Sequence, residues 1–291
     1  MSSVILLTVL SLSSLAIIAA VILYFVAQKF KVYEDPRIDL VQDLLPAANC
    51  GGCGFAGCRN LAEALVKADT FDGLYCPVGG AKVMEEVAKL LGKTAIAADP
   101  LVAVLKCNGT PDVRQKTTSY IGVYDCRITH NLYMGETDCS YGCLGYGDCE
   151  RACTFDAIHI DITTGLPVIS DEKCVACGAC VKACPRNLIE LRKKAKKDRK
   201  IYVACSNCDK GGPARKACKA ACIACGKCFK VCEFGAITIE NNLAYIDAGK
   251  CTFCRKCVTE CPTGCILEIN FPPRKPKSEP QAQSVPENPN V

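Results

Sequence analysis

Residues 222–232 read Cys-Ile-Ala-Cys-Gly-Lys-Cys-Phe-Lys-Val-Cys, a run of four cysteines in the spacing Cys-x2-Cys-x2-Cys-x3-Cys. The same spacing returns in residues 251–261, and Pro262 follows the last cysteine. Three thiolates in one short loop suit three irons of a [4Fe-4S] cubane, and the fourth cysteine of each run binds the neighbouring cluster. Zinc also uses Cys-x2-Cys pairs, but a zinc ion takes four ligands and has no use for two interleaved runs. This stretch therefore predicts two iron–sulfur clusters rather than zinc.

An earlier stretch repeats this pattern. Residues 174–184 carry the regular spacing, whereas residues 139–153 carry a stretched version, Cys-x3-Cys-x5-Cys-x3-Cys. The sequence Phe-x-Ala-Ile begins two residues after Cys153, and it begins again two residues after Cys232. Residues 137–191 and 220–270 are therefore predicted to be internal repeats of one two-cluster ferredoxin unit.

Exchange of the fourth ligand between paired runs assigns four cluster sites. Site 2 would be held by Cys139, Cys143, Cys149 and Cys184, and site 3 by Cys174, Cys177, Cys180 and Cys153. Site 4 would be held by Cys222, Cys225, Cys228 and Cys261, and site 5 by Cys251, Cys254, Cys257 and Cys232.

A single-cluster module precedes the repeats. Four cysteines in the spacing Cys-x2-Cys-x4-Cys-x17-Cys form site 1, namely Cys50, Cys53, Cys58 and Cys76. The glycines between them let the backbone wrap closely around a cluster. Residues 52–57 also match the G-x-G-x-x-G string of dinucleotide-binding folds, but no strand precedes them, which disfavours a nucleotide site. Helical periodicity at 59–70 and 81–91 predicts a small helical module.

Six cysteines remain outside these five sites: Cys107, Cys126, Cys205, Cys208, Cys218 and Cys265. One interpretation is that they are buried free thiols. The other is a sixth cluster held by Cys107, Cys126, Cys205 and Cys218, with Cys208 as a competing ligand. Ligands so far apart in the sequence are not assigned by spacing, so both interpretations stay open. The expected cofactors are therefore five or six [4Fe-4S] clusters.

The composition agrees with metal clusters as the organising cores. Cysteine makes up 26 of the 291 residues, and tryptophan is missing. A disulfide-rich secreted protein is the alternative, but neighbours in a Cys-x2-Cys loop are badly placed to pair with each other. The formal net charge of +5 counts every cysteine as neutral, whereas five clusters of about −2 each would bring the balance to roughly −5. The apparent basicity therefore does not indicate nucleic-acid binding.

The N-terminal segment predicts a membrane anchor. The 24 residues from 4 to 27 carry no charge and are rich in Leu, Ile, Val and Ala, which is long enough to cross a bilayer core of ~30 Å. A cleaved signal peptide is the alternative, although no Lys or Arg precedes the run and the run is longer than a usual signal core. Lys29, Lys31 and Arg37 follow. They favour a retained single-pass anchor in the plasma (inner) membrane, with the cysteine-rich part on the cytoplasmic side.

The predicted fold class is α+β, with one N-terminal transmembrane helix, a small helical [4Fe-4S] module and two ferredoxin-like two-cluster modules. A basic run at 192–200 is either a solvated loop or a docking patch for an acidic electron carrier or lipid headgroups. The predicted boundaries are 1–28 for the anchor, 29–92 for the single-cluster module, 93–136 for a connecting region, 137–200 and 201–270 for the ferredoxin-like domains, and 271–291 for a proline-rich disordered tail.

These motifs resemble those of one family. The order of the modules, the run Asn-Cys-Gly-Gly-Cys-Gly at 49–54 and the run Gly-Cys-Leu-Gly-Tyr-Gly-Asp-Cys at 142–149 are similar to the B subunit of the Rnf complex. This complex is an ion-translocating ferredoxin:NAD+ oxidoreductase of bacterial and archaeal membranes. The second ferredoxin unit makes the chain look like the extended type. Thr154 and Glu233 depart from the ferredoxin pattern, in which Pro often follows the closing cysteine.

The resemblance implies a subunit that accepts electrons from reduced soluble ferredoxin and passes them to partner subunits that reduce NAD+ and move Na+ or H+. Membrane lipid is a further expected partner, and nucleic acid is not. The residues supply cluster ligands in series but no acid–base pair, nucleophile or nucleotide loop, so the chain has no complete active site of its own. Two alternatives stay open: a membrane-tethered polyferredoxin that serves another reductase without ion transport, and a zinc-stabilised scaffold with no redox role.

Overall fold

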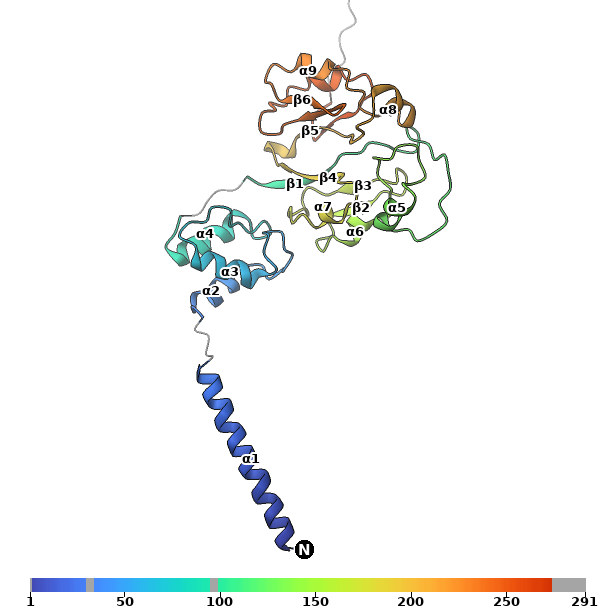
Figure 1. The fold of residues 1–291 in the computed structure, drawn as a ribbon. Helices are drawn as coiled ribbons and strands as arrows, with labels where there is room; N and C mark the ends of the chain where they lie inside the picture. Colours follow the sequence, from blue (N-terminus) through green and yellow to red (C-terminus); the bar gives the residue numbers. More distant parts are fainter. Residues whose placement is uncertain (1, 30–33, 95–98, 274–291) are drawn as a thin grey trace, which may run out of the picture.

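The computed structural model describes residues 2–29, 34–94 and 99–273 (Figure 1). Lys31 of the predicted positive flank and the tail beyond residue 273 lie outside the described residues. The described chain is a mixture of short helices and two-stranded sheets behind one long N-terminal helix. This agrees with the predicted α+β class.

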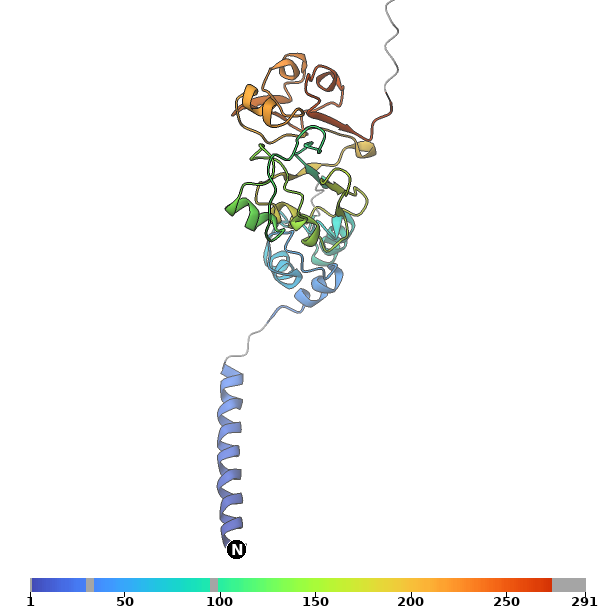
Figure 2. The same cartoon turned by 90° about the vertical axis from the view of Figure 1, so that its right-hand side faces the viewer.

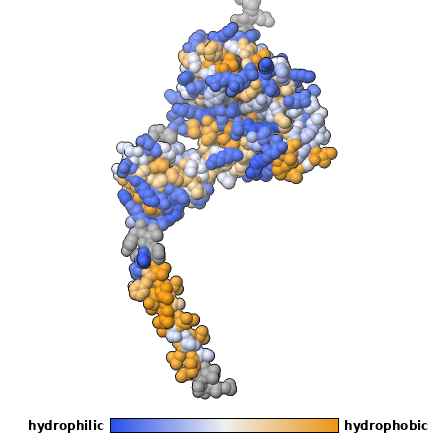
Figure 3. Space-filling model, viewed as in Figure 1, coloured by the Kyte–Doolittle hydropathy of each residue, from blue (hydrophilic) through white to orange (hydrophobic). Residues whose placement is uncertain are grey.

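Helix α1 (Ser2–Lys29) stands apart from the rest of the chain (Figures 1 and 2). Its segment Leu6–Lys29 has a mean hydropathy of 2.6, and none of it is buried against the protein. Figure 3 shows most of this helix as a hydrophobic surface. At ~1.5 Å per residue, its 24 residues exceed the ~30 Å of a bilayer's hydrocarbon core. The predicted apolar helix is therefore present, with the length and composition of a membrane span.

Three helices form a small core around the first cysteines. They are α2 (Arg37–Leu44), α3 (Cys58–Lys67) and α4 (Gly80–Leu91). Each buries one apolar stripe, and Val41 and Leu65 are fully buried among them. The helical periodicity predicted after Cys58 and after Gly80 thus corresponds to α3 and α4.

The remaining strands form two sets with the same topology. In the first, β1 (Leu101–Leu105) pairs antiparallel with β4 (Ile189–Lys193), and β2 (Ile158–Ile160) pairs with β3 (Pro167–Ile169). In the second, β5 (Lys200–Val203) pairs with β8 (Ile266–Ile269), and β6 (Ile237–Glu240) pairs with β7 (Leu243–Ile246). Each set has an outer pair made of its first and last strands and an inner hairpin. We call the two sets, with the chain between their strands, the first and second units.

Short helices connect these strands. In the first unit they are α5 (Cys126–Leu132), α6 (Asp148–Arg151) and α7 (Ala179–Ala183). In the second they are α8 (Gly211–Ala217), α9 (Lys227–Val231) and α10 (Lys256–Thr259), and a 3-10 turn, η1 (Lys196–Asp198), lies between the units. Helix α6 packs against α7, and α9 packs against α10. Strand β1 lies in the stretch predicted to be a connector, and its pairing with β4 makes it part of the first unit.

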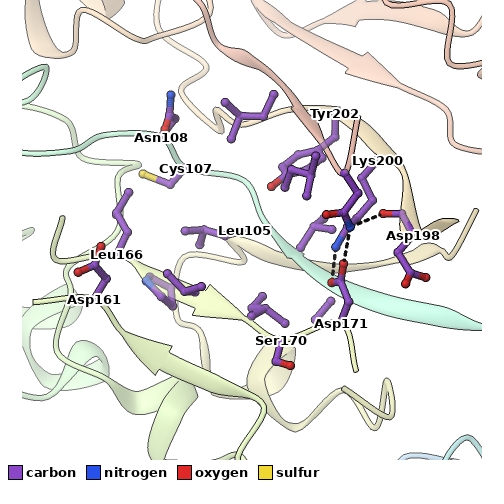
Figure 4. A pocket seen from close by; sticks show the side chains of 18 of the residues that line it. Leu105, Cys107, Asn108, Asp161, Leu166, Ser170, Asp171, Asp198, Lys200 and Tyr202 are labelled. Atoms are coloured by element: carbon purple, nitrogen blue, oxygen red, sulfur yellow. Dashed lines mark hydrogen bonds and ion pairs between the residues drawn. The ribbon is translucent and has the colours of Figure 1, made fainter. Parts of the chain in front are cut away.

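The two units meet at a cleft of about 790 Å³ that is lined by β1, β3, β5 and β8 (Figure 4). The basic run 192–200 lies at this junction. Arg192 is buried, with its guanidinium over the rings of Tyr202 and Tyr245. Lys200 is only 7% exposed and forms an ion pair with Asp171 of the first unit. Arg192 and Lys200 therefore help to hold the units together, whereas Lys193, Lys196 and Lys197 are exposed.

Candidate iron–sulfur centres

The thiols predicted for site 1 lie around the helical core. Cys58 begins α3, and its backbone N–H donates to the side-chain oxygen of Asn49 over 2.8 Å. Burial raises the pKa of the Cys76 thiol, and the nearby charges of Cys53 and Cys58 raise it further. The fourth thiol, Cys50, lies toward site 3, where its charge acts on Cys177.

At sites 3, 4 and 5 the structure brings together all four predicted thiols, because each set lines a single cavity. The three loops share one backbone feature. The residue before the second cysteine, which is Ala176, Ala224 or Phe253, has a positive φ of 55°, 51° or 60° respectively. Such a left-handed residue turns successive backbone N–H groups toward one centre, which favours a bound anion or an anionic cluster.

Site 4 holds a fifth thiol that the sequence did not assign to it. Cys265 lines the same cavity as the four predicted ligands. Its Sγ lies 3.5 Å from Sγ of Cys261. Cys265 is buried, so it belongs to the interior of the site.

At site 2 the structure brings together a different set from the predicted one. The cavity there is lined by Cys143, Cys149 and Cys184, as predicted, and by Cys126. Cys126 begins α5, and its backbone N–H donates to Oδ1 of the buried Asp148 over 3.0 Å. Burial raises the pKa of the Cys149 thiol to about 12, and the charges of Cys126 and Cys184 contribute to the rise. Cys139, which was predicted for this site, does not line the cavity.

Cys139 instead lies with three of the unassigned cysteines at the junction of the two units. Burial raises the pKa of Cys218, and the charges of Cys139 and Cys107 raise it further. Burial likewise raises the pKa of Cys205 to about 12, with Cys139 among the nearby charges. Asn207 connects two of these thiols, since its backbone N–H donates to Sγ of Cys205 at 3.4 Å and its side-chain amide to Sγ of Cys139 at 3.6 Å. We call Cys107, Cys139, Cys205 and Cys218 the junction group.

The junction group is symmetric with respect to the two units. Cys107 follows β1 by two residues and Cys205 follows β5 by two residues. The backbone N–H of Cys143 donates to Sγ of Cys107 over 3.4 Å, and the backbone N–H of Cys222 donates to Sγ of Cys205 over 3.3 Å. Cys139 and Cys218 each precede one of these donors by four residues. Each unit thus contributes an equivalent pair of thiols.

At sites 2, 3, 4 and 5, four or more thiols line one cavity. Four thiols around a cavity match a cluster with an iron at each of four corners. Burial raises the pKa of Cys180 to about 11 and that of Cys257 to about 12, so iron binding would be needed to deprotonate them at neutral pH.

The six groups adjoin one another in a series. Site 5 adjoins site 4, because Cys228 is among the charges that act on Cys257. The hydrogen bonds to Cys205 and Cys107 connect site 4 to the junction group and the junction group to site 2. Site 2 adjoins site 3 through Cys149 and Cys180. Site 3 adjoins site 1, because the backbone of Gly52 packs on Cys177, where an added Cβ would come within 2.8 Å of Cα.

These features define an iron–sulfur electron-transfer protein with a candidate membrane helix. Three family models match the corresponding stretches: a putative Fe-S cluster at residues 45–70, a 4Fe-4S binding domain at residues 167–190 and a 4Fe-4S dicluster domain at residues 221–265.

Curated relatives cover most of the chain. The B subunit of the Na(+)-translocating ferredoxin:NAD(+) oxidoreductase complex of Acetobacterium woodii is 48% identical over 240 residues, which are 82% of this chain and 71% of that protein. The B subunit of the proton-translocating complex of Clostridium ljungdahlii is 40% identical, over 92% of this chain and 94% of that protein. The B subunit of the ion-translocating oxidoreductase complex of Methanosarcina acetivorans is 38% identical, over 91% and 99% respectively. The chain belongs to this family, the B subunits of Rnf ion-translocating oxidoreductase complexes.

Proposed function

We propose that the chain relays electrons from reduced ferredoxin toward partner subunits that reduce NAD+, within a membrane complex that couples this transfer to Na+ or H+ transport. The observation that carries the proposal is the unbroken series of cysteine groups that runs to site 1 from sites 4 and 5, which hold the exposed Cys225 and Cys254. The names of the relatives supply the donor, the acceptor and the transported ion. When bound, each [4Fe-4S] cluster would take up and release one electron.

We further propose six clusters with two changes to the ligand sets expected from spacing. Site 2 is held by Cys126, Cys143, Cys149 and Cys184, and a sixth cluster is held by the junction group. Sites 1, 3, 4 and 5 keep the ligands expected from the sequence. The junction cluster is the only one of the six that would connect the two units.

Cys208 is left out of the junction cluster for two reasons. Its Sγ lies 3.7 Å from the carbonyl oxygen of Ser206, to which it donates. It also stands three residues after Cys205, and the corresponding position after Cys107 in the first unit is Thr110 rather than a further cysteine. Cys208 therefore has no equivalent in an otherwise symmetric group.

The chain's own residues hold and shield these clusters. Backbone N–H groups donate to ligand sulfurs, as Ala157 does to Cys153 and Leu188 does to Cys184, each over 3.4 Å. Buried aliphatic side chains such as Ile158, Leu188 and Ile237 keep water away from the sulfurs. Hydrogen bonding and solvent exposure at each site then set its reduction potential.

Helix α1 is proposed as the membrane anchor. Lys29 ends the helix and Arg37 follows a few residues later, so the cysteine-rich part lies on the cytoplasmic side by the positive-inside rule. A reducing cytoplasm also keeps the thiols available for cluster assembly.

The junction group offers the sharpest test. In anaerobically purified protein, Cys218→Ser should remove about four irons per chain and stop ferredoxin-driven reduction of site 1. Chemical reduction of the clusters in each unit by dithionite should remain. Cys208→Ser is the matched control and should change neither iron content nor transfer. If Cys218→Ser keeps its iron content and its rate of electron transfer to site 1, no junction cluster takes part in the relay.

A further inference from the structure

One stretch of the second unit carries charge of a single sign. Between residues 210 and 230 there is no Asp or Glu, and six basic residues are present: Lys210, Arg215, Lys216, Lys219, Lys227 and Lys230. All six are exposed. Within the described residues none of them has a carboxylate at ion-pair distance, although the charges of Asp112 and Lys219 act on each other at the edge. We call these six residues the basic collar.

The basic collar lies on the two helices beside an exposed ligand of site 4. Cys225 and Cys254 are the two exposed cysteines of the chain. Two residues after Cys225 begins α9, which carries Lys227, Lys230 and between them Phe229, whose side chain is 54% exposed. Helix α8 approaches the same loop from the other side, since a Cβ on Gly211 would come within 2.9 Å of the carbonyl oxygen of Ile223. Basic side chains from two helices therefore flank one cluster loop.

The loops of sites 3 and 5 lack this combination. Beside the exposed Cys254 of site 5, Arg255 forms an ion pair with Glu268 and Lys256 forms one with Glu233. The loop of site 3 has only Lys173 and Lys182 nearby in sequence, and the backbone of Gly52 covers its Cys177. In the basic run 192–200, Lys200 is paired with Asp171 at the junction of the units, and the exposed Lys196 and Lys197 stand eight or more residues from the nearest cysteine in the sequence. The basic collar is thus a local feature and not a consequence of general composition.

We propose that a small acidic electron-transfer protein docks on the basic collar, with Phe229 in the contact and Cys225 beneath it. The inference rests on the proposed function and specifies the face through which the reduced donor reaches site 4. Unpaired surface charges steer an oppositely charged partner and set its orientation, and an apolar aromatic within a polar rim is typical of protein interfaces. One electron passes from the donor's reduced centre to site 4, with no bond made or broken and no proton moved.

The alternative to an acidic protein is an anionic lipid surface, which a basic patch can also bind. The exposed ligand and Phe229 favour a redox protein, because lipid binding has no need of a cluster ligand at the centre of the contact. The second unit also lies at the opposite end of the chain from α1 in both views (Figures 1 and 2).

The test uses the full chain in detergent with its clusters assembled, and a purified acidic two-[4Fe-4S] bacterial ferredoxin as probe. The Kd is measured anaerobically by surface plasmon resonance at low and high NaCl concentrations. Lys227→Glu with Lys230→Glu should raise the Kd at least tenfold at low salt and flatten its salt dependence. Lys196→Glu with Lys197→Glu makes the same charge change on exposed residues away from site 4 and should change the Kd less than twofold. Iron content should be unchanged in both variants.

Three outcomes would overturn the proposal. One is an unchanged Kd in the collar variant, and another is an equal loss in the control variant. The third is a loss confined to Lys250→Glu with Lys256→Glu, which would place the contact over Cys254. Sedimentation with vesicles of anionic phospholipid tests the lipid alternative, and a collar variant that loses vesicle binding but keeps ferredoxin binding would favour lipid. If the unaltered chain neither binds ferredoxin nor takes electrons from it, the proposed function itself fails.

Discussion

A single buried side chain distinguishes site 4 from its counterparts. The fourth residue after the closing cysteine is Ala157, Leu188 or Ala236 at three sites and Cys265 at the fourth, and all four are buried. The Cys265 thiol is the main reason that the pKa of Cys261 is held down at about 4. A donor to a ligand sulfur stabilises negative charge and therefore the reduced cluster.

Cys265→Ala should accordingly lower the midpoint potential of the site 4 cluster. Loss of one hydrogen bond worth ~1 kcal/mol corresponds to roughly 40 mV for one electron. An anaerobic redox titration followed by electron paramagnetic resonance measures the shift, and Cys208→Ala should leave the potential where it is. A loss of about four irons would instead mean that Cys265 is itself a ligand.

Spacing defines groups of thiols most directly where the ligands are close in sequence. A Cys-x2-Cys-x2-Cys loop has few ways to arrange its short backbone, and the thiols of sites 3, 4 and 5 line one cavity each. The position of Cys126 at the site 2 cavity was not predicted. A long irregular stretch separates Cys126 from Cys143, and no spacing rule describes the path of such a loop. The signal for Cys139 was present, since Cys139 and Cys218 both stand four residues before a ligand.

At the scale of elements, α5 depends on its first turn. Oδ1 of Asp125 accepts hydrogen bonds from the backbone N–H groups of Arg127 at 2.9 Å and Ile128 at 3.0 Å. This N-cap fixes the start of a helix that begins at Cys126. Because seven residues are too few for a helix to be stable alone, the cap and the bonds to Asp148 position the thiol.

Asp125→Ala should therefore destabilise α5 by about 1 kcal/mol and speed the loss of the site 2 cluster about fivefold. The measurement is iron release to a chelator under argon. Asp125→Ser keeps a capping oxygen and should release iron at close to the original rate. Equal release rates for all three proteins would show that the cap does not position Cys126.

The pairing of β1 with β4 is a part of the fold that sequence patterns do not predict. The hairpins β2–β3 and β6–β7 form between strands close in sequence, and the Phe-x-Ala-Ile signal precedes both. Strand β1 lies in the stretch predicted to be a connecting region, and the cysteines of sites 2 and 3 stand between it and its partner β4 in the sequence. Pairing over such a distance depends on the clusters and loops between the strands, which local propensity does not encode.

At the scale of the whole molecule, the contact between the units depends on a buried charge. Asp171 accepts from Lys200, and from the side-chain amide of Asn270 at 3.2 Å, while its carbonyl oxygen accepts from Lys194 at 3.1 Å. Figure 4 shows Asp171 and Lys200 together beside the cleft. Removing the carboxylate would leave the ammonium of Lys200 buried without a partner.

Asp171→Ala should thus destabilise the junction by about 3 kcal/mol. The unfolding rate is followed by the bleaching of the cluster absorbance in guanidinium chloride under argon, and Asp171→Ala should bleach faster than the unaltered protein. Asp156→Ala removes an exposed carboxylate that pairs with Lys173 and should cost less than ~1 kcal/mol. If Asp171→Ala and Asp156→Ala bleach at the same rate, the buried pair does not hold the units together.

The relay as a whole depends on close contact between site 3 and site 1, and Gly52 makes that contact possible. A Cβ at residue 52 would lie 2.8 Å from Cα and 2.9 Å from the carbonyl oxygen of Cys177, both of them backbone atoms. Gly52→Ala should therefore push the two loops apart and slow electron transfer from site 3 to site 1 several-fold, while iron content stays the same. Rapid freeze-quench electron paramagnetic resonance after mixing with reduced ferredoxin follows the reduction of site 1. Gly212→Ala, where a Cβ meets nothing within 4 Å, should leave that rate unchanged, and an unaltered rate in Gly52→Ala would mean that electrons leave site 3 by another route.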